Sequence, residues 1–272
     1  MFNWSLFIIL VLLAVPGIVV TLPQLIGMLD TLIANQVGPN QKRPSRTTLL
    51  IIAIMQYLFL AAGATALGVW LAPKVGLTAS FFSALADRVW SWPVLIVQLK
   101  PAVLLGSGGA LIFVIAYYSF FRPRFDPQTR QASEKMRYDM GLAARLLYGG
   151  IYEEILARWG LMTLIAWLGL LLTGSSTGIV MWSAIIIAGI IFGLFHVPNY
   201  VATGSRPTPF FIAYMIVMNG WASIVFGYLF WQYGLLAAMV AHMLFHLWWW
   251  PFDRLVYQPT AVTTHHQLPQ LN

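Results

Sequence analysis

The sequence predicts an all-α fold, a polytopic transmembrane bundle of seven to eight helices. Hydrophobic residues make up 60% of the 272 residues and charged residues only 8%, whereas a soluble domain carries about 25% charged residues. The apolar residues gather in stretches close to the ~20 residues that an α-helix needs to cross the hydrocarbon core of a bilayer. Many of the twelve tryptophans stand near the ends of these stretches, as expected for an interfacial aromatic belt. We therefore expect an integral multi-pass protein of the plasma (cytoplasmic) membrane.

The first predicted spans follow the apolar stretches in order. The stretch at roughly 5–28 is expected to be a retained helix and not a cleaved signal peptide, because no basic segment precedes it and no clear small-residue cleavage site follows it. A polar, basic loop over about 35–47 leads to the second span at roughly 48–72. The segment 74–100 is ambiguous, since it fits either an interfacial helix or an eighth span. The third span is expected over about 101–121.

One long hydrophilic segment, 122–145, divides the chain and contains six Lys or Arg and three acidic residues. After it, apolar stretches predict spans over about 146–173, 179–198, 210–230 and 235–250. No internal repeat is visible in the chain.

These stretches divide the chain into four parts. They are the N-terminal transmembrane helices over 1–121, a cytoplasmic loop over 122–145, a helical core over 146–250 and a polar C-terminal tail over 251–272. We expect His265 and His266 in that tail to be unstructured and without a functional role.

The positions of the basic residues predict the orientation in the membrane. Placing 122–145 in the cytoplasm also places 35–47, 199–208 and the C-terminal tail there. The short turns 174–178 and 231–234 then lie outside and contain no Lys or Arg. We therefore expect the N-terminus outside and the C-terminus inside.

The formal net charge of +7 comes from cations scattered between apolar spans. This distribution is typical of basic loops at an anionic leaflet, so we expect membrane lipids as partners and no nucleic acid. The chain has no cysteine, which excludes disulfides and a thiol nucleophile.

Two carboxylates and a guanidinium interrupt the apolar core of the chain at Glu153, Glu154 and Arg158. An ionisable group in hydrocarbon costs roughly 2.5 kcal/mol or more, so such groups face the bundle interior and usually have a function. Glu154 and Arg158 are four residues apart on one helix face and are expected to form an ion pair. Glu153 points about 100° away and has no local partner, which makes it the candidate general base. The alternative is a purely structural ion-pair cluster between helices.

Three histidines, His196, His242 and His246, also lie in apolar segments. His242 and His246 are four residues apart and face the same way. The predicted topology places Glu153 roughly 12 Å inside the cytoplasmic edge and places the histidines in the same half of the bilayer. Each histidine alone also fits an interhelical hydrogen bond, but a shared depth for residues from three helices favours one active site.

The chemistry of this set favours hydrolysis of an amide or ester at the membrane. A carboxylate and an imidazole can remove a proton from water, and further imidazoles can stabilise an oxyanion. Zinc is the alternative, because His196, His242, His246 and Glu153 could assemble a site across helices. His242 and His246 have the spacing of zinc ligands, although Met243 replaces the glutamate of a zincin motif.

Two other classes of protein fit the same residues. A proton- or ion-coupled transporter would use the Glu/His set as a relay, but groups at one depth leave no chain of relays towards the outer face. A non-catalytic immunity or scaffold protein would keep the site without turnover.

Three short motifs resemble those of the CPBP family, which groups the CAAX prenyl endopeptidases with bacteriocin-processing and bacteriocin-immunity membrane proteases. That family carries Glu-Glu-x-x-x-Arg, Phe-x-x-x-His and His-x-x-x-Asn/Asp in this order. The matching residues are Glu153-Glu154-x-x-x-Arg158, Phe192-x-x-x-His196 and His242-x-x-x-His246. The resemblance covers roughly 145–250.

The resemblance implies an intramembrane endopeptidase of about eight helices with a site open to the cytoplasmic leaflet. It implies a CAAX-like or hydrophobic peptide, or a lipidated protein, as substrate. Glu153 would activate water with the help of His196, and His242 and His246 would stabilise the oxyanion. Glu154 and Arg158 would support the site.

The sequence departs from the family at His246, where Asn or Asp is usual. An imidazole can donate a hydrogen bond as an amide does, so the oxyanion role is retained. An imidazole is also the better zinc ligand. We expect no cofactor, with zinc as the alternative, because a carboxylate and an imidazole suffice for general-base catalysis.

Overall fold

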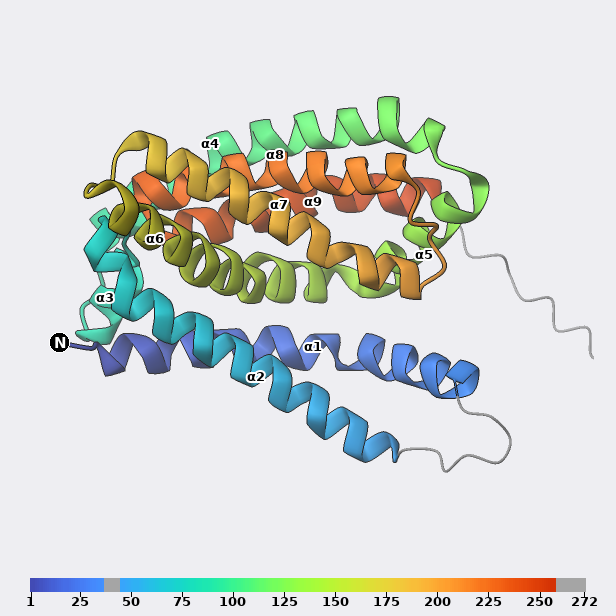
Figure 1. The fold of residues 1–272 in the computed structure, drawn as a ribbon, viewed down its shortest axis with the longest axis horizontal. Coiled ribbons are helices and arrows are strands. Elements are labelled where there is room, and N and C mark those ends of the chain that lie inside the picture. The colour runs from blue at the N-terminus through green and yellow to red at the C-terminus, as the bar shows by residue number, and fades with distance from the viewer. Residues whose placement is uncertain (37–44, 258–272) are drawn as a thin grey trace, which may run out of the picture.

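The computed structural model describes residues 1–36 and 45–257, and within these ranges the fold is α-helical without a β-strand (Figure 1). The predicted all-α bundle is confirmed. Among the described residues, seven helical stretches are long and apolar enough to cross a membrane: Trp4–Gly27, Arg46–Val75, Trp92–Arg124, Pro127–Thr173, Gly178–Ala202, Pro209–Tyr233 and Leu235–Val256. The basic loop predicted over 35–47 lies partly outside the described residues, and His265 and His266 of the tail lie wholly outside them.

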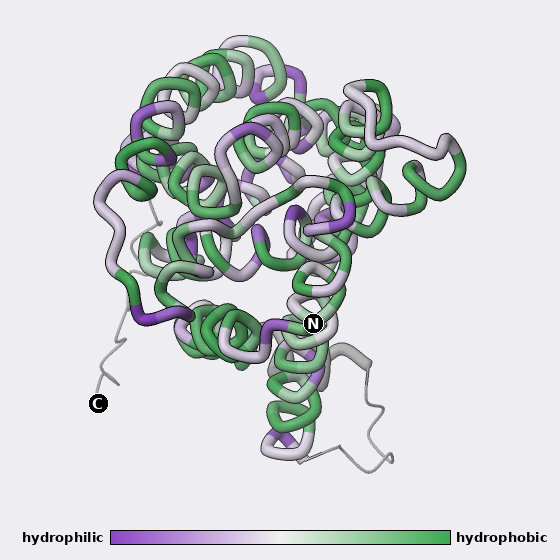
Figure 2. Tube along the Cα trace, turned by 90° about the vertical axis from the view of Figure 1, so that its left-hand side faces the viewer, coloured by the Kyte–Doolittle hydropathy of each residue, from purple (hydrophilic) through white to green (hydrophobic). Residues whose placement is uncertain are grey.

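The outer surface of the bundle is apolar, as a lipid-facing surface must be. On helix α2 (Arg46–Leu71), the large side chains Ile51, Met55 and Phe59 are exposed, and on helix α4 (Trp92–Ala116) Leu104 is exposed. Figure 2 shows that hydrophobic segments dominate the helices. Monomeric soluble proteins do not expose apolar patches of this extent, so the chain is an integral multi-pass membrane protein.

Helices α1 (Trp4–Gln36) and α2 form one side of the bundle, against the long helical segment that follows residue 144 (Figure 1). Gly17 permits the close approach of α1 to this segment. A Cβ at position 17 would lie 2.7 Å from the carbonyl oxygen of Leu147, a contact that backbone atoms cannot relieve by rotating. Glycine therefore sets the distance between the two helices at this point.

The ambiguous segment 74–100 does not add a span. It contains a 3-10 turn (Ala72–Val75) and helix α3 (Ser80–Ala86), and the seven residues of α3 extend only about 10 Å. The third span begins at Trp92 and not near residue 101 as predicted. Ser91 caps α4 by accepting a hydrogen bond from the Val94 amide at 3.5 Å, and Pro101 lies inside the helix, as transmembrane helices tolerate.

The hydrophilic segment 122–145, predicted as a loop, contains helix α5 (Pro127–Ala144). Asp126 caps it by accepting a hydrogen bond from the Thr129 amide at 3.1 Å. Its polarity is misleading because several charges are buried in ion pairs, such as Arg137 Nε with Asp253 Oδ1 at 3.1 Å. Gly141, with a φ of 71°, breaks the regular helix, and such a conformation favours glycine.

The central segment after α5 has wide, π-helical turns in η4 (Arg145–Glu153) and η5 (Ile155–Met162), and continues as α6 (Thr163–Thr173). π-Helical turns are rare and frequently occur at functional sites. On its other side lie α4, α7 (Gly178–Ala202), α8 (Pro209–Tyr233) and α9 (Leu235–Val256) (Figure 1). The central segment is thus enclosed by helices from both ends of the chain.

Replacing Gly17 by alanine should destabilise the bundle, because the added methyl group meets the Leu147 carbonyl. We expect the free energy of unfolding to fall by roughly 1–3 kcal/mol, as for other overpacked sites. Thermal unfolding of the purified protein in detergent would measure this. Gly63→Ala on α2 is the matched control, because a Cβ there meets no atom within 4 Å. Equal melting temperatures for the two variants would contradict the proposed close contact.

Candidate active site

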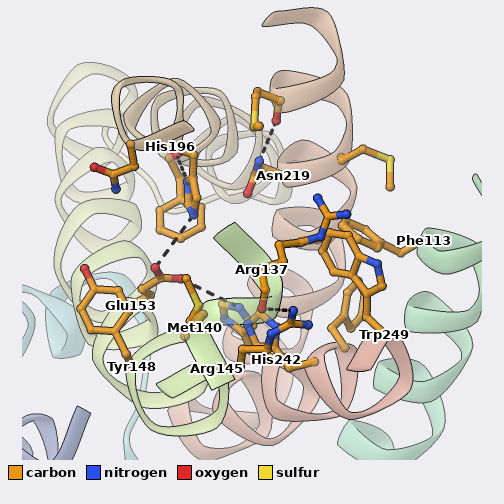
Figure 3. A pocket seen from close by; sticks show the side chains of 18 of the residues that line it. Phe113, Arg137, Met140, Arg145, Tyr148, Glu153, His196, Asn219, His242 and Trp249 are labelled. Atoms are coloured by element: carbon orange, nitrogen blue, oxygen red, sulfur yellow. Dashed lines mark hydrogen bonds and ion pairs between the residues drawn. The ribbon is translucent and has the colours of Figure 1, made fainter. Parts of the chain in front are cut away.

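A cavity of about 140 Å³ lies between the central segment and helices α7, α8 and α9 (Figure 3). Glu153, His196, His242 and His246 all line it. The rest of the wall is mostly methionine and aromatic side chains. An apolar cavity with a few convergent polar groups is the usual form of a small binding or active site.

Glu153 faces two histidines from other helices across this cavity (Figure 3). Its Oε1 lies 3.9 Å from His196 Nε2 on α7, and its Oε2 lies 4.0 Å from His242 Nε2 on α9. Both distances exceed the length of a direct hydrogen bond. The three groups therefore face a common space and are too far apart to form direct hydrogen bonds with one another.

The backbone of α7 holds the His196 ring in place. His196 Nδ1 donates to the carbonyl oxygen of Phe192, one turn earlier, at 2.8 Å. Because a carbonyl oxygen only accepts, Nδ1 carries the proton, and in the neutral imidazole Nε2 is left as an acceptor. That Nε2 is the atom that faces Glu153.

Glu154 orients the second ring. His242 Nδ1 lies 2.7 Å from Glu154 Oε1, and the ring stacks on Phe226 of α8 with a centroid distance of 4.6 Å. The contact directs His242 Nε2 towards Glu153. A histidine held by a carboxylate through one nitrogen presents the other in a defined direction.

Glu154 also forms the ion pair expected from its spacing with Arg158. Arg158 Nη1 lies 3.2 Å from Glu154 Oε1, and the two residues are 2% and 0% exposed. The Arg158 guanidinium lies over the rings of Phe192 and Phe226, at 5.5 and 5.2 Å from the centroids. Glu154 thus joins the central segment to α9 through His242, while its partner Arg158 contacts α7 and α8.

His246 shares the cavity wall but takes a different position. It stacks on His242 with a centroid distance of 4.9 Å, whereas the ion pairs of Glu153 are with His196 and His242. Its Nε2 lies against Gly149, where a Cβ would be only 2.5 Å from that nitrogen. Only glycine leaves room for the His246 ring in this position.

Residues 140–248 match the family model described as Type II CAAX prenyl endopeptidase Rce1-like. This segment is similar to Rce1-like domains and is called the Rce1-like domain below. It contains all the residues of the three motifs and agrees with the resemblance to the CPBP family. The match spans less than half of the chain, and searches of curated proteins and of solved structures found no significant match. In general terms, the Rce1-like domain supports a CAAX-type intramembrane protease with a peptide or prenylated protein substrate.

The Rce1-like domain does not present a preassembled zinc site. Within residues 1–36 and 45–257, no group of three or more His, Cys, Asp or Glu residues is arranged to hold a metal ion. The Glu154 contact occupies only Nδ1 of His242 and leaves its Nε2 facing the cavity, as in a histidine that ligates a metal. Zinc held by Glu153, His196 and His242 therefore stays the alternative to a site that uses only carboxylate and imidazole groups.

Several residues of the Rce1-like domain and its flank were not predicted as part of the site. Tyr148, Asn199, Asn219, Arg137 and Arg145 all line the cavity. The asparagines and the tyrosine carry no distinctive spacing in the sequence. The two arginines lie at the hydrophilic segment that was predicted to be a loop.

One further sequence pattern lies away from the cavity. Gly174–Gly178 reads Gly-Ser-Ser-Thr-Gly and fits the letters of a G-x-S-x-G nucleophile motif. That motif requires a turn from a strand into a helix. Here the pattern lies in an exposed turn between α6 and α7, so Ser176 has none of the context of such a nucleophile.

Replacing Glu154 by alanine should strongly destabilise the Rce1-like domain. The change leaves Arg158 buried without its counter-ion, and breaking a buried pair in this way costs about 3–5 kcal/mol. Thermal unfolding in detergent would measure the loss. Asp139→Ala is the control, because the ion pair of Asp139 with Lys135 is exposed and contributes little. A loss below 1 kcal/mol for Glu154→Ala would show that the contact does not hold the helices together.

Proposed function

We propose that this protein is an intramembrane endopeptidase in which Glu153 activates a water molecule that attacks a peptide bond. The observation that carries the proposal is the position of the Glu153 carboxylate, which faces the Nε2 atoms of His196 and His242 at about 4 Å across a cavity. Polar groups separated by more than about 3.5 Å are commonly bridged by water. The attacking water would occupy the space between them.

The hydrogen-bonding capacity of these groups fits such a water. Glu153 can accept one of its protons, and neutral His196 can accept the other through Nε2. The lone pairs of the water oxygen are then free to attack the carbonyl carbon of the substrate. A C–O bond forms, Glu153 takes the proton, and the tetrahedral intermediate collapses by breaking the C–N bond. The proton on Glu153 passes to the leaving amine, as expected of a general base that becomes a general acid.

The oxyanion of this intermediate requires hydrogen-bond donors. His242 donates through Nδ1 to Glu154, so it can donate through Nε2 only as an imidazolium. The adjacent Glu154 carboxylate would stabilise a proton that His242 takes up during the reaction, which supports a role of His242 at the oxyanion and of Glu154 as its support. His246, stacked on His242, would supply a second donor from the same wall.

The cavity wall favours hydrophobic substrate residues. Met136, Met140, Met215 and Met218 line it together with aromatic rings, and methionine side chains adapt to apolar groups of different shape. Together with the Rce1-like match, this supports a CAAX-like or other hydrophobic peptide, or a prenylated protein, as substrate. The distribution of basic residues favours cleavage at the cytoplasmic side.

Replacing Glu153 by glutamine should abolish cleavage without unfolding the protein. We expect kcat on a prenylated CAAX peptide to fall by at least about 100-fold, because general-base catalysis contributes roughly 10²–10⁴-fold. The melting temperature should stay near that of the unaltered protein, because Glu153 makes no direct hydrogen bond to either histidine. Product formation by mass spectrometry would measure the rate.

Asp139→Asn on the exposed side of α5 serves as the control and should keep the full rate. Full activity of Glu153→Gln would contradict the assignment of the base. A cellular function that persists in Glu153→Gln without turnover would favour a scaffold.

Peptidase activity should persist in the presence of a metal chelator, because the proposed steps use only carboxylate and imidazole groups. The assay would follow cleavage after treatment with 1,10-phenanthroline. A zinc peptidase in the same detergent would confirm that the chelator acts. Loss of activity that added Zn²⁺ restores would replace this mechanism by a metal-dependent one.

A further inference from the structure

We propose that Arg137, Arg145 and Trp249 form a subsite in the same cavity that binds the free α-carboxylate at the C-terminus of a peptide. This inference rests on the proposed function, because it identifies the end of the substrate that the endopeptidase would recognise. All three residues line the cavity (Figure 3).

A buried charge cluster provides the first argument. Asp253 on α9 pairs with Arg137 Nε at 3.1 Å and with Arg145 Nη2 at 2.7 Å. The three residues are only 1–4% exposed. Asp253 Oδ1 also accepts a hydrogen bond from the Tyr118 hydroxyl at 3.0 Å. Two guanidinium groups thus share one carboxylate whose two oxygens are both engaged, which leaves one positive charge uncompensated.

Unpartnered hydrogen-bond donors provide the second argument. In the described part of the chain, no acceptor meets Arg137 Nη1, Arg145 Nη1 or Trp249 Nε1, although all three atoms are buried. A buried donor without a partner costs about 1–3 kcal/mol, so three of them along one cavity require an explanation. A carboxylate supplies two acceptor oxygens and the missing negative charge, and guanidinium groups bind it in a defined orientation.

The aromatic surroundings of the arginines favour a bound ligand over solvent. The Arg137 guanidinium lies 4.7 Å from the Tyr117 ring centroid and 4.8 Å from that of Trp249. Its Nη2 donates to the Tyr117 hydroxyl at 2.5 Å. These contacts fix the guanidinium while keeping it in an apolar environment, where a charge-assisted hydrogen bond is strongest.

The distance along α9 relates this subsite to the proposed site of cleavage. Asp253 follows His246 by seven residues, which is about 10.5 Å along a helix. An extended peptide covers about 3.3–3.6 Å per residue, so roughly three residues fit between the two levels. A CAAX motif has three residues between its cysteine and the terminal carboxylate. By binding the terminal carboxylate, the subsite would therefore fix how many residues separate the cleaved bond from the C-terminus of the substrate.

The test compares two peptides that differ only at the C-terminus, a farnesylated CAAX peptide with a free carboxylate and its carboxamide. Binding to the full-length Glu153→Gln protein in detergent is measured for both, so that cleavage does not interfere. We expect the free acid to bind at least 10-fold more tightly. Adding Arg145→Gln should reduce this preference to below 3-fold, and Arg145→Lys should retain part of it. The preference is a ratio within one preparation and does not depend on the fraction of folded protein.

Two further variants separate ligand binding from a merely structural cluster. Asp253→Asn removes the competing carboxylate and should preserve or increase the preference for the acid, whereas a purely structural role would make it act like Arg145→Gln. Arg124→Gln changes an exposed arginine that packs on Phe120 and should leave the preference unchanged.

The inference is overturned if both peptides bind equally, if neither binds, or if Arg145→Gln leaves the preference intact. The unaltered protein is assayed for cleavage in parallel. Cleavage of both peptides at equal rates with equal binding would reject the subsite and keep the proposed function. Tighter binding of the acid without any cleavage would reject the proposed function and keep the subsite.

Discussion

The contact between Glu154 and His242 is the interaction on which the site depends. It joins the central segment to α9 across 88 residues of sequence, and the same carboxylate pairs with Arg158. Ionisable groups inside an apolar bundle are stable only when they find such partners. By pairing with two of them at once, Glu154 fixes the ring that faces Glu153, whereas Glu153 makes no direct hydrogen bond to His196 or His242. The support and the proposed base are therefore adjacent residues with opposite environments.

The same rule organises the second polar cluster. Asp253 holds Arg137 and Arg145 and so connects α5, the start of the central segment and the last turn of α9. The two clusters differ in their charge balance, because the second contains one more cation than anion. An ion pair with no net charge would be enough if the cluster only connected the helices. Buried donors without a hydrogen-bond partner occur in both clusters, since Arg158 Nη1 and Nη2 also lack one among the described residues, so it is the excess positive charge that favours an anion at the second cluster.

Much of the fold follows from the length of the apolar stretches, because a membrane helix must be continuous and apolar. The errors occur where a local signal was ambiguous. The segment 74–100 was ambiguous and the third span was expected to begin near residue 101, although α4 begins at Trp92 behind the Ser91 cap. The charges of 122–145 suggested a solvated loop, although Arg137 and Glu134 are buried.

Local spacing also limits what could be predicted of the site. It placed Glu154 and Arg158 on one helix face, where they form an ion pair. It could not give the pairing of Glu154 with His242 or of Arg145 with Asp253, because these contacts depend on how distant helices pack. Each of the three motifs contributes residues that line one cavity, while their catalytic roles are the proposal made above.

The absence of a side chain at position 149 has a consequence for how this site can change. The His246 ring fills the space that a Cβ on residue 149 would need. The two positions therefore divide one fixed volume, and a larger residue at one requires a smaller residue at the other. The shorter asparagine in place of His246 would leave room for alanine at 149, whereas in this chain alanine would require the His246 ring to move. Substitutions at these two positions are coupled by size alone, independently of the chemistry that either residue performs.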